Sequence, residues 1–283
     1  MSERASSKLY RFGPPVLVAL SAAALASCGE TQPSRPQETQ TDAPAPNPTQ
    51  PSVVVPTPEP VLTRNDLVEA AGRAASVYAS GQDLPAEDSL VGRTFSVRMA
   101  FGCDGPALPG SEQPGTAHWS WGAERKTIVL RMLPADWKDA AMITQAGVSG
   151  KWEAIEGFWI ARPWLLVDGC PAAKGDPLQT AAVTSPQTLG LAAVFEAGGS
   201  RLSRRDGRAY QFTVRPKDAP LVPPKNGYRL LLQGRVESFP SGRAVECRAS
   251  NPNERPVCVL AARLDRVAFE TSGQEMLAEW RTD

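Results

Sequence analysis

The sequence predicts a mainly β protein, an antiparallel sandwich or barrel, whose folded part begins with one helix. Short runs rich in β-branched, aromatic and aliphatic residues recur throughout residues 91–280, and Gly, Pro and Asp-Gly separate them. This spacing is typical of antiparallel strands joined by tight turns. A clear helical period occurs in residues 64–80, ahead of the first of these runs.

The helix expected at residues 64–80 has recognisable ends. Thr63 is followed three residues later by Asp66, which is the spacing of a capping box at a helix N-terminus. Leu62 and Leu67 stand where a hydrophobic staple would fix the entry of the chain. Gly81 provides a natural stop. The apolar positions that predict the buried face are Leu67, Ala70, Ala71, Ala74, Val77 and Tyr78.

The strands are expected where apolar residues alternate, or run continuously, between turn signals. In residues 91–101, Phe95, Val97 and Met99 fall on one face of an extended chain. Residues 136–145 fit either a short helix or a loop. The other expected strands are residues 117–121, 127–133, 152–160, 189–195, 208–214, 228–239, 244–248, 257–269 and 276–280.

The folded part is long enough for one large β domain or for two smaller ones. Residues 171–188 are polar and contain Pro and Gly, which makes them the best internal boundary. We therefore expect a Trp-rich β subdomain at residues 63–175, including the helix, and a C-terminal β subdomain at residues 185–283.

The first 27 residues have the layout of an export signal. Basic residues precede an uncharged and mostly apolar stretch at residues 14–26. This stretch is shorter than the roughly 20 helical residues that span a bilayer. The sequence Leu-Ala-Ser-Cys that ends at Cys28 resembles the lipobox of bacterial lipoproteins, in which an aliphatic residue and two small residues precede a cysteine.

The resemblance to lipoproteins covers this segment alone and implies a lipid anchor. It implies that the Cys28 thiol receives a diacylglyceryl group, that signal peptidase II cuts before Cys28, and that the new amine is acylated, with palmitate as the expected label. Gly29 replaces the Asp that retains enterobacterial lipoproteins at the inner membrane. The expected location is therefore the cell envelope, at the outer membrane and facing the periplasm.

Residues 28–62 are expected to form a disordered tether between the lipid and the folded part. Nine prolines fall between Pro33 and Pro60, and aromatic residues are absent. Such a composition buries too little apolar surface to offset the entropy of ordering. Prolines favour the extended polyproline II conformation, which would span roughly 100 Å over this length.

Four cysteines remain after Cys28, and an even number in an exported chain predicts two disulfides. Three pairings are possible. Cys247 and Cys258 enclose a turn-rich loop between two expected strands, so we expect them to pair, which leaves Cys103 with Cys170. A zinc site is the alternative, but the chain has no Cys-x-x-Cys spacing and one histidine. We expect neither a metal nor a cofactor.

Composition and motifs leave the function open. The chain has 30 basic and 30 acidic residues, without the clustered positive charge of nucleic-acid-binding proteins, so we expect no nucleic-acid partner. His118 is the sole histidine, and no Gly-x-Ser-x-Gly motif accompanies it. Glycosidase chemistry needs two carboxylates. The candidate carboxylates are Glu153, Glu156, Asp104 and Asp168, but the spacing in the sequence selects no pair among them.

Tryptophan is the feature with the most direct link to binding. Six of the seven tryptophans lie between Trp119 and Trp164. Aromatic faces beside Arg or acidic residues grip sugar rings, and aromatic rings also fill β cores because each buries a large area. The candidates for ligand binding are Trp119, Trp121, Trp152, Trp159 and Trp164.

The preferred interpretation is a non-enzymatic binding or structural module of the cell envelope. It would be attached to the membrane by its lipid and would present a β-rich unit to an envelope protein or a glycan. The alternative is a periplasmic hydrolase that acts on cell-wall glycan or peptide. A cleft with two convergent carboxylates would favour the hydrolase, whereas an exposed aromatic surface would favour binding.

Overall fold

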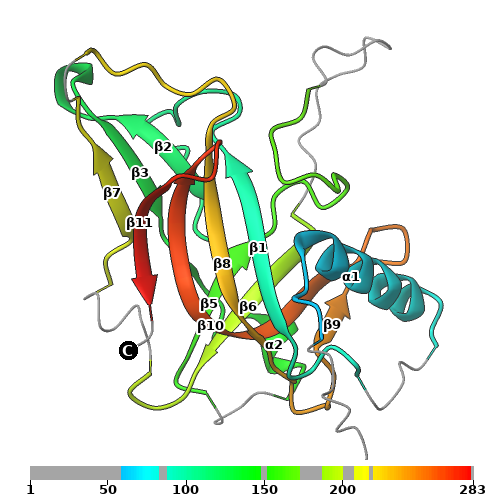
Figure 1. The fold of residues 1–283 in the computed structure, drawn as a ribbon. Coiled ribbons are helices and arrows are strands. Elements are labelled where there is room, and N and C mark those ends of the chain that lie inside the picture. Colours follow the sequence, from blue (N-terminus) through cyan, green and yellow to red (C-terminus); the bar gives the residue numbers. More distant parts are fainter. Residues whose placement is uncertain are drawn as a thin grey trace, which may run out of the picture. The chain divides into compact units, whose positions relative to one another are not determined.

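The fold of this protein is mainly β (Figure 1), as the sequence predicts. The computed structural model describes residues 59–82, 88–147, 152–172, 187–199, 207–216 and 219–281. The expected signal segment, Cys28 and the tether up to residue 58 lie outside these ranges. Residues 56–283 form one compact unit.

The predicted N-terminal helix is confirmed as α1 (Arg64–Ala79). At its start the Thr63 N–H donates to the Asp66 carboxylate at 2.6 Å, as in a capping box. Leu62 and Leu67 are both buried. Beyond its end, Gly81 has a φ of +67°, a left-handed conformation that glycine adopts without strain. Local sequence signals therefore account for both ends of α1.

Each expected strand region contains a strand. Residues 136–145, which fitted a helix or a loop, contain the short helix α2 (Ala141–Thr144). A single 3-10 turn, η1, spans Ala123–Arg125. The strands are β1 (Thr94–Phe101), β2 (Ala117–Trp121), β3 (Ile128–Met132), β4 (Ala135–Asp136), β5 (Ala154–Trp159), β6 (Leu189–Phe195), β7 (Tyr210–Val214), β8 (Tyr228–Val236), β9 (Val245–Arg248), β10 (Val257–Thr271) and β11 (Met276–Arg281).

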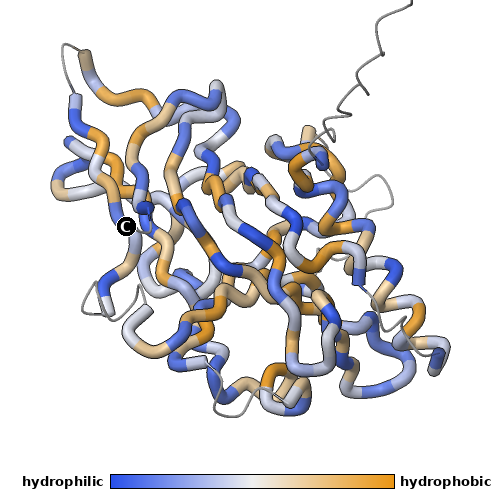
Figure 2. The backbone as a smooth tube through the Cα atoms, turned by 60° about the horizontal axis from the view of Figure 1, so that its bottom comes forward, coloured by the Kyte–Doolittle hydropathy of each residue, from blue (hydrophilic) through white to orange (hydrophobic). Residues whose placement is uncertain are grey.

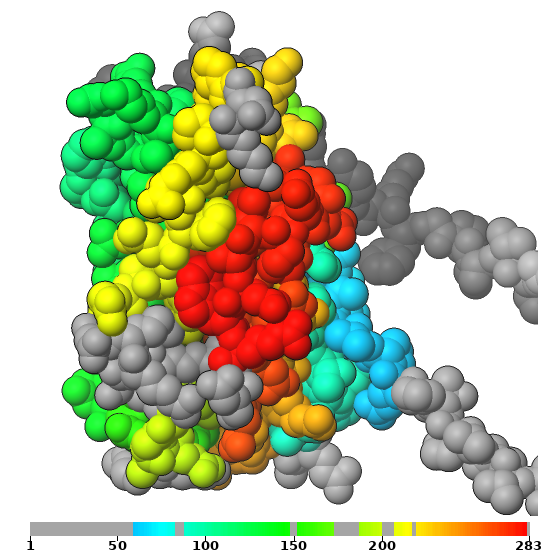
Figure 3. Space-filling model, turned by 60° about the vertical axis from the view of Figure 1, so that its left-hand side comes forward, coloured from blue at the N-terminus to red at the C-terminus, as the bar shows by residue number. Residues whose placement is uncertain are grey.

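The long strand β10 organises the larger sheet. Among the described residues this sheet has eight strands in the order β1-β8-β10-β6-β5-β4, with β9 and β11 also paired to β10. The first part of β10 lies between β6 and β9, and the second part lies between β8 and β11. β11 lies at the surface, in red in Figure 3. The smaller sheet has the order β2-β3-β7.

The structure differs from a purely antiparallel barrel in two respects. The sheets do not close into a barrel, because β1 and β4 stand at the two ends of the main strand order. In addition, β6 and β10 are parallel, whereas the other paired strands of the described residues are antiparallel. A parallel pair needs a long crossover, here formed by β7, β8 and β9, and hydrophobic periodicity does not reveal such a connection.

The main sheet also draws on both halves of the chain. β1, β4 and β5 come from residues 63–175, and β6, β8 and β10 come from residues 185–283. These strands are interleaved, and residues 56–283 form one compact unit. The structure therefore gives no boundary at residues 171–188 in the pairing of the described strands.

Two apolar cores explain the strand sequences. The larger core lies between the two sheets and α1, and it includes Phe95, Leu130 and Leu260. The smaller core covers the opposite face of β5 and β6 and includes Trp137. All seven residues of β6 are buried because both of its faces are covered, which explains its continuous apolar sequence. In the first part of β1, by contrast, buried residues alternate with exposed or partly exposed ones. Figure 2 shows how hydrophobic and hydrophilic residues follow one another along the chain.

The structure confirms both predicted disulfides. Cys103 and Cys170 are joined across a sequence separation of 67 residues, with their Cα atoms 5.5 Å apart. Cys247 and Cys258 face each other in the ladder between β9 and β10, with their Cα atoms 4.1 Å apart. The first bridge ties the loop after β5 to the end of β1. The second closes the loop between β9 and β10.

Candidate functional site

Most of the tryptophans singled out from the sequence are core residues. Trp119 and Trp152 are buried, one in each core, and Trp119 packs edge-on against Trp121 with ring centroids 5.7 Å apart. Trp159 is partly buried and packs against Trp137. Core packing therefore accounts for four of the five candidates. Trp164 is different, because 55% of its surface is exposed.

Trp164 belongs to an apolar loop at residues 161–168, named here the Trp164 loop. Leu166 is 49% exposed and Val167 is 59% exposed, so three large apolar side chains face solvent within four residues. Exposed apolar side chains so close in the chain make this loop a candidate contact surface. The loop follows β5 and ends at the Cys103–Cys170 disulfide.

The backbone of the Trp164 loop is bound by Arg64, the first residue of α1. Arg64 is buried, with 3% of its surface exposed. Its guanidinium donates to the carbonyl oxygens of Ala161 and Arg162, each at 2.8 Å, and to that of Leu165. Burial lowers the pKa of Arg64, and the Asp168 carboxylate opposes this shift. Arginine remains charged in proteins. A buried cation therefore organises the loop backbone.

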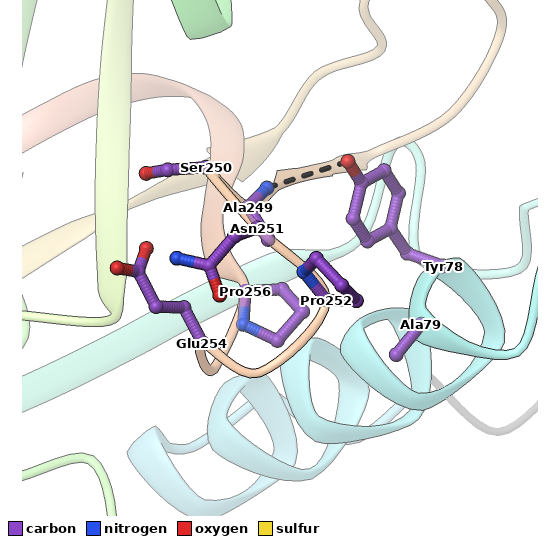
Figure 4. A pocket seen from close by; sticks show the side chains of 8 residues that line it. All are labelled: Tyr78, Ala79, Ala249, Ser250, Asn251, Pro252, Glu254 and Pro256. Atoms are coloured by element: carbon purple, nitrogen blue, oxygen red, sulfur yellow. Dashed lines mark hydrogen bonds between the residues drawn. The ribbon is translucent and has the colours of Figure 1, made fainter.

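A pocket of about 490 Å³ lies at the other end of α1, and we name it the Tyr78 pocket (Figure 4). The end of the helix forms one wall, and the loop between β9 and β10 forms the other. The volume falls in the range of small-molecule sites, roughly 300–1,000 Å³. The residues that line it are Tyr78, Ala79, Ala249, Ser250, Asn251, Pro252, Glu254 and Pro256.

The walls of the Tyr78 pocket are fixed by local interactions. The Tyr78 hydroxyl accepts a hydrogen bond from the Ala249 N–H at 3.3 Å, which joins the helix to the loop (Figure 4). The Asn251 side-chain oxygen accepts from the Asn253 N–H at 2.9 Å, so the turn is held by its own side chain. The Cys247–Cys258 disulfide closes the base of the loop. Tyr78 remains 38% exposed, so its ring is available to a ligand.

The Tyr78 pocket combines an aromatic ring with hydrogen-bonding side chains. Figure 4 shows the Asn251 amide and the Glu254 carboxylate near each other, with the Tyr78 ring on the other side of the loop. A ring that can stack and planar groups that can pair with hydroxyls are the elements by which proteins hold sugars. The helical period predicts Tyr78 on the buried face of the helix, but the structure exposes it. Its position in the last helical turn, next to a disulfide-closed loop, was the missed signal.

The four carboxylates considered for hydrolysis are buried, hydrogen-bonded or close to an arginine in the described structure. Glu156 is buried in β5, and the Glu153 carboxylate accepts a hydrogen bond from the Gly198 N–H. Asp104 and Asp168 each lie near an arginine, Arg162 and Arg64 respectively. None of the four belongs to the residues that line the Tyr78 pocket. Within the described residues, no three His, Cys, Asp or Glu side chains are grouped to hold a metal ion.

His118 lies on β2 opposite Arg131 of β3 and is partly buried. Burial lowers its pKa, Glu112 raises it and Arg131 lowers it, with a net downward shift.

The lowered pKa of His118 predicts a pH dependence of stability. In the unfolded state the imidazole has a pKa of about 6.5, so the unfolded state binds the proton first as the pH falls. We expect stability from this group to be complete above about pH 6.5 and to decline below it. Urea unfolding from pH 7.5 to 5 should show a steeper decline for the wild type than for His118→Gln, and parallel curves would contradict this.

Comparisons with known proteins return no match: no family model, no curated protein and no solved structure resembles this chain. Among the described residues, neither helix has the length and apolar character needed to cross a membrane.

Proposed function

We propose that this protein is a lipid-anchored protein of the cell envelope that binds a glycan without cleaving it. The lipid would be attached at Cys28, and residues 28–62 would tether the folded unit to the membrane. The glycan would occupy the Tyr78 pocket. The observation that carries the binding function is a pocket lined by a partly exposed aromatic residue and, across the β9–β10 loop from it, by an amide and a carboxylate.

The location is supported by two independent features. The residues before Cys28 match the pattern of a lipoprotein signal, and a Pro-rich stretch follows. The folded unit contains two disulfides, which persist mainly in oxidising compartments such as the bacterial periplasm. The two features agree on export from the cytoplasm.

The chemistry of the Tyr78 pocket supports binding in preference to hydrolysis. Glycoside hydrolysis commonly uses two carboxylates that flank the scissile bond. Among the described residues that line the pocket, Glu254 supplies the one carboxylate. Glu254 can accept hydrogen bonds from sugar hydroxyls, and the Asn251 amide can donate to a ring or carbonyl oxygen. Tyr78 can cover one apolar face of the sugar ring.

Co-sedimentation with purified cell-wall sacculi tests this function. We expect the acylated full-length protein in detergent to sediment with the sacculi and Tyr78→Ala to bind about tenfold more weakly, a change of about 1.4 kcal/mol. Tyr78→Phe retains the ring and should stay close to the wild type. Val222→Ala, at an exposed apolar residue outside the pocket lining, is the control for general surface changes. Equal sedimentation of wild type and Tyr78→Ala, or none for the wild type, would contradict glycan binding at this site.

A further inference from the structure

We propose that the Trp164 loop inserts its apolar tip into the interface of the phospholipid bilayer. This inference rests on the proposed lipid anchor and assigns a second membrane contact to the folded unit. The tip consists of Trp164, Leu166 and Val167, whose exposed fractions are 55%, 49% and 59%.

The chemistry of the tip fits a bilayer interface. An indole ring favours the level of the lipid headgroups, where its apolar body and its N–H both find suitable surroundings. Aliphatic side chains such as those of Leu166 and Val167 enter the acyl boundary below. Interfacial binding of this kind grows with the apolar area that leaves water. Three exposed apolar side chains within four residues supply that area.

The backbone of the loop is already ordered for such a contact. The buried Arg64 guanidinium holds the carbonyl groups of Ala161, Arg162 and Leu165. The Arg162 side chain in turn donates to the Ala100 carbonyl of β1. The Cys103–Cys170 disulfide fixes the end of the segment. Little conformational entropy is therefore lost when the tip binds.

The charges around the loop favour a bilayer over a glycan. The guanidinium groups of Arg64 and Arg162 donate to backbone carbonyls, one of which is that of Leu165 in the loop itself. The side chains of the tip, Trp164, Leu166 and Val167, are all apolar, and the Asp168 carboxylate that follows them in the sequence lies near the Arg64 guanidinium. The Tyr78 pocket, in contrast, is lined by an amide and a carboxylate. A lipid anchor at Cys28 would also confine the tip to within the reach of the tether and so raise its effective concentration at the bilayer.

This docking would set the position of the Tyr78 pocket. Arg64, below the loop, is the first residue of α1, and Tyr78 lies in its last turn. At 1.5 Å per residue the two are about 21 Å apart along the helix axis. The two sites are therefore at opposite ends of one rigid element. When the tip is in the bilayer, the pocket lies at the end of α1 that is remote from the tip.

An environment-sensitive fluorophore at the tip tests the proposal. The full-length acylated protein carrying Leu166→Cys is labelled with NBD without reduction of its disulfides and is reconstituted into phosphatidylcholine vesicles. We expect strong quenching by nitroxides on the lipid acyl chains and weak quenching by aqueous iodide. The matched control is Ser76→Cys, at an exposed position of α1, for which the opposite pattern is expected. Adding Trp164→Ala and Val167→Ala should reduce the lipid quenching at position 166 at least about fivefold.

Several results would overturn the proposal. Iodide access at position 166 equal to that at position 76, on protein that floats with the vesicles, would exclude docking and leave the lipid anchor intact. Shielding of position 166 that requires added envelope proteins would identify a protein partner in place of the bilayer. Protein that does not float with the vesicles would contradict the anchor and the docking together.

Discussion

Arg64→Ala is expected to lower the free energy of unfolding by about 3–5 kcal/mol, the largest effect of any single substitution considered for this protein. Arg64 is buried and donates charged hydrogen bonds to three carbonyl oxygens. Its removal leaves these oxygens without their donor and leaves a cavity between α1 and the Trp164 loop. Unfolding in urea, monitored by circular dichroism, measures the change.

Two variants separate this role from a general effect of charge. Arg73→Ala removes an exposed arginine of the same helix that pairs with Glu69 at 3.9 Å, and it should change stability by less than about 0.5 kcal/mol. Arg64→Lys keeps the charge but lacks the planar fork that reaches three carbonyls, so it should also be destabilising. A stability of Arg64→Ala within about 1 kcal/mol of the wild type would show that the loop does not depend on this contact.

Removal of the Cys103–Cys170 disulfide by the double substitution Cys103→Ala and Cys170→Ala is expected to cost roughly 4 kcal/mol. A crosslink restricts the unfolded chain, and the restriction grows with the length of the closed loop. The separation here is 67 residues, compared with 11 residues for Cys247 and Cys258. The second double variant should therefore lose less stability, about 3 kcal/mol.

The two double variants should differ in how much stability they lose, with the larger loss for the Cys103 and Cys170 variant. Both double variants are unfolded in urea under identical conditions, and the wild type with and without reductant provides the reference. A larger loss for the Cys247 and Cys258 variant would mean that loop closure does not determine the contribution of these bridges. The Cys103 and Cys170 variant should also release the end of the Trp164 loop, which limited proteolysis near residue 168 would detect.

Elements with strong local signals could be predicted from the sequence. The limits of α1 could be predicted because they depend on residues next to them in the chain. At the start, the Asp66 carboxylate accepts a hydrogen bond from the Thr63 N–H, and beyond the end Gly81 adopts a left-handed conformation. Strand regions could be placed because their apolar residues must be buried. The disulfide pairing followed from the short chain distance between Cys247 and Cys258.

Features that depend on distant segments could not be predicted. The parallel pairing of β6 with β10 and the mixing of both chain halves in one sheet are properties of the topology. Trp137 illustrates a second limit, because its ring lies against Gly157 and Gly190 on neighbouring strands. A side chain at either glycine would occupy the space of that ring. The sequence shows two glycines and a tryptophan but not that they meet.

The Trp164 loop and the Tyr78 pocket also depend on contacts that the sequence does not reveal. Clustering of tryptophans drew attention to residues 119–164, but one sequence cannot distinguish a buried ring from an exposed one. The loop that carries the exposed Trp164 is bonded through its backbone to Arg64, about a hundred residues away in the sequence. Tyr78 lines a pocket because its helix ends beside the loop of β9 and β10. Both surfaces arise from contacts between segments that are distant in the sequence.

Metabolic labelling with a palmitate analogue tests the lipid anchor, on which the rest of the functional account depends. The wild-type chain should incorporate the label and migrate as the mature form that begins at Cys28. Cys28→Ser should incorporate none, and mass spectrometry should find residues 1–27 still attached. Undiminished label in the Cys28→Ser protein, or a wild-type chain that carries no lipid, would contradict the account.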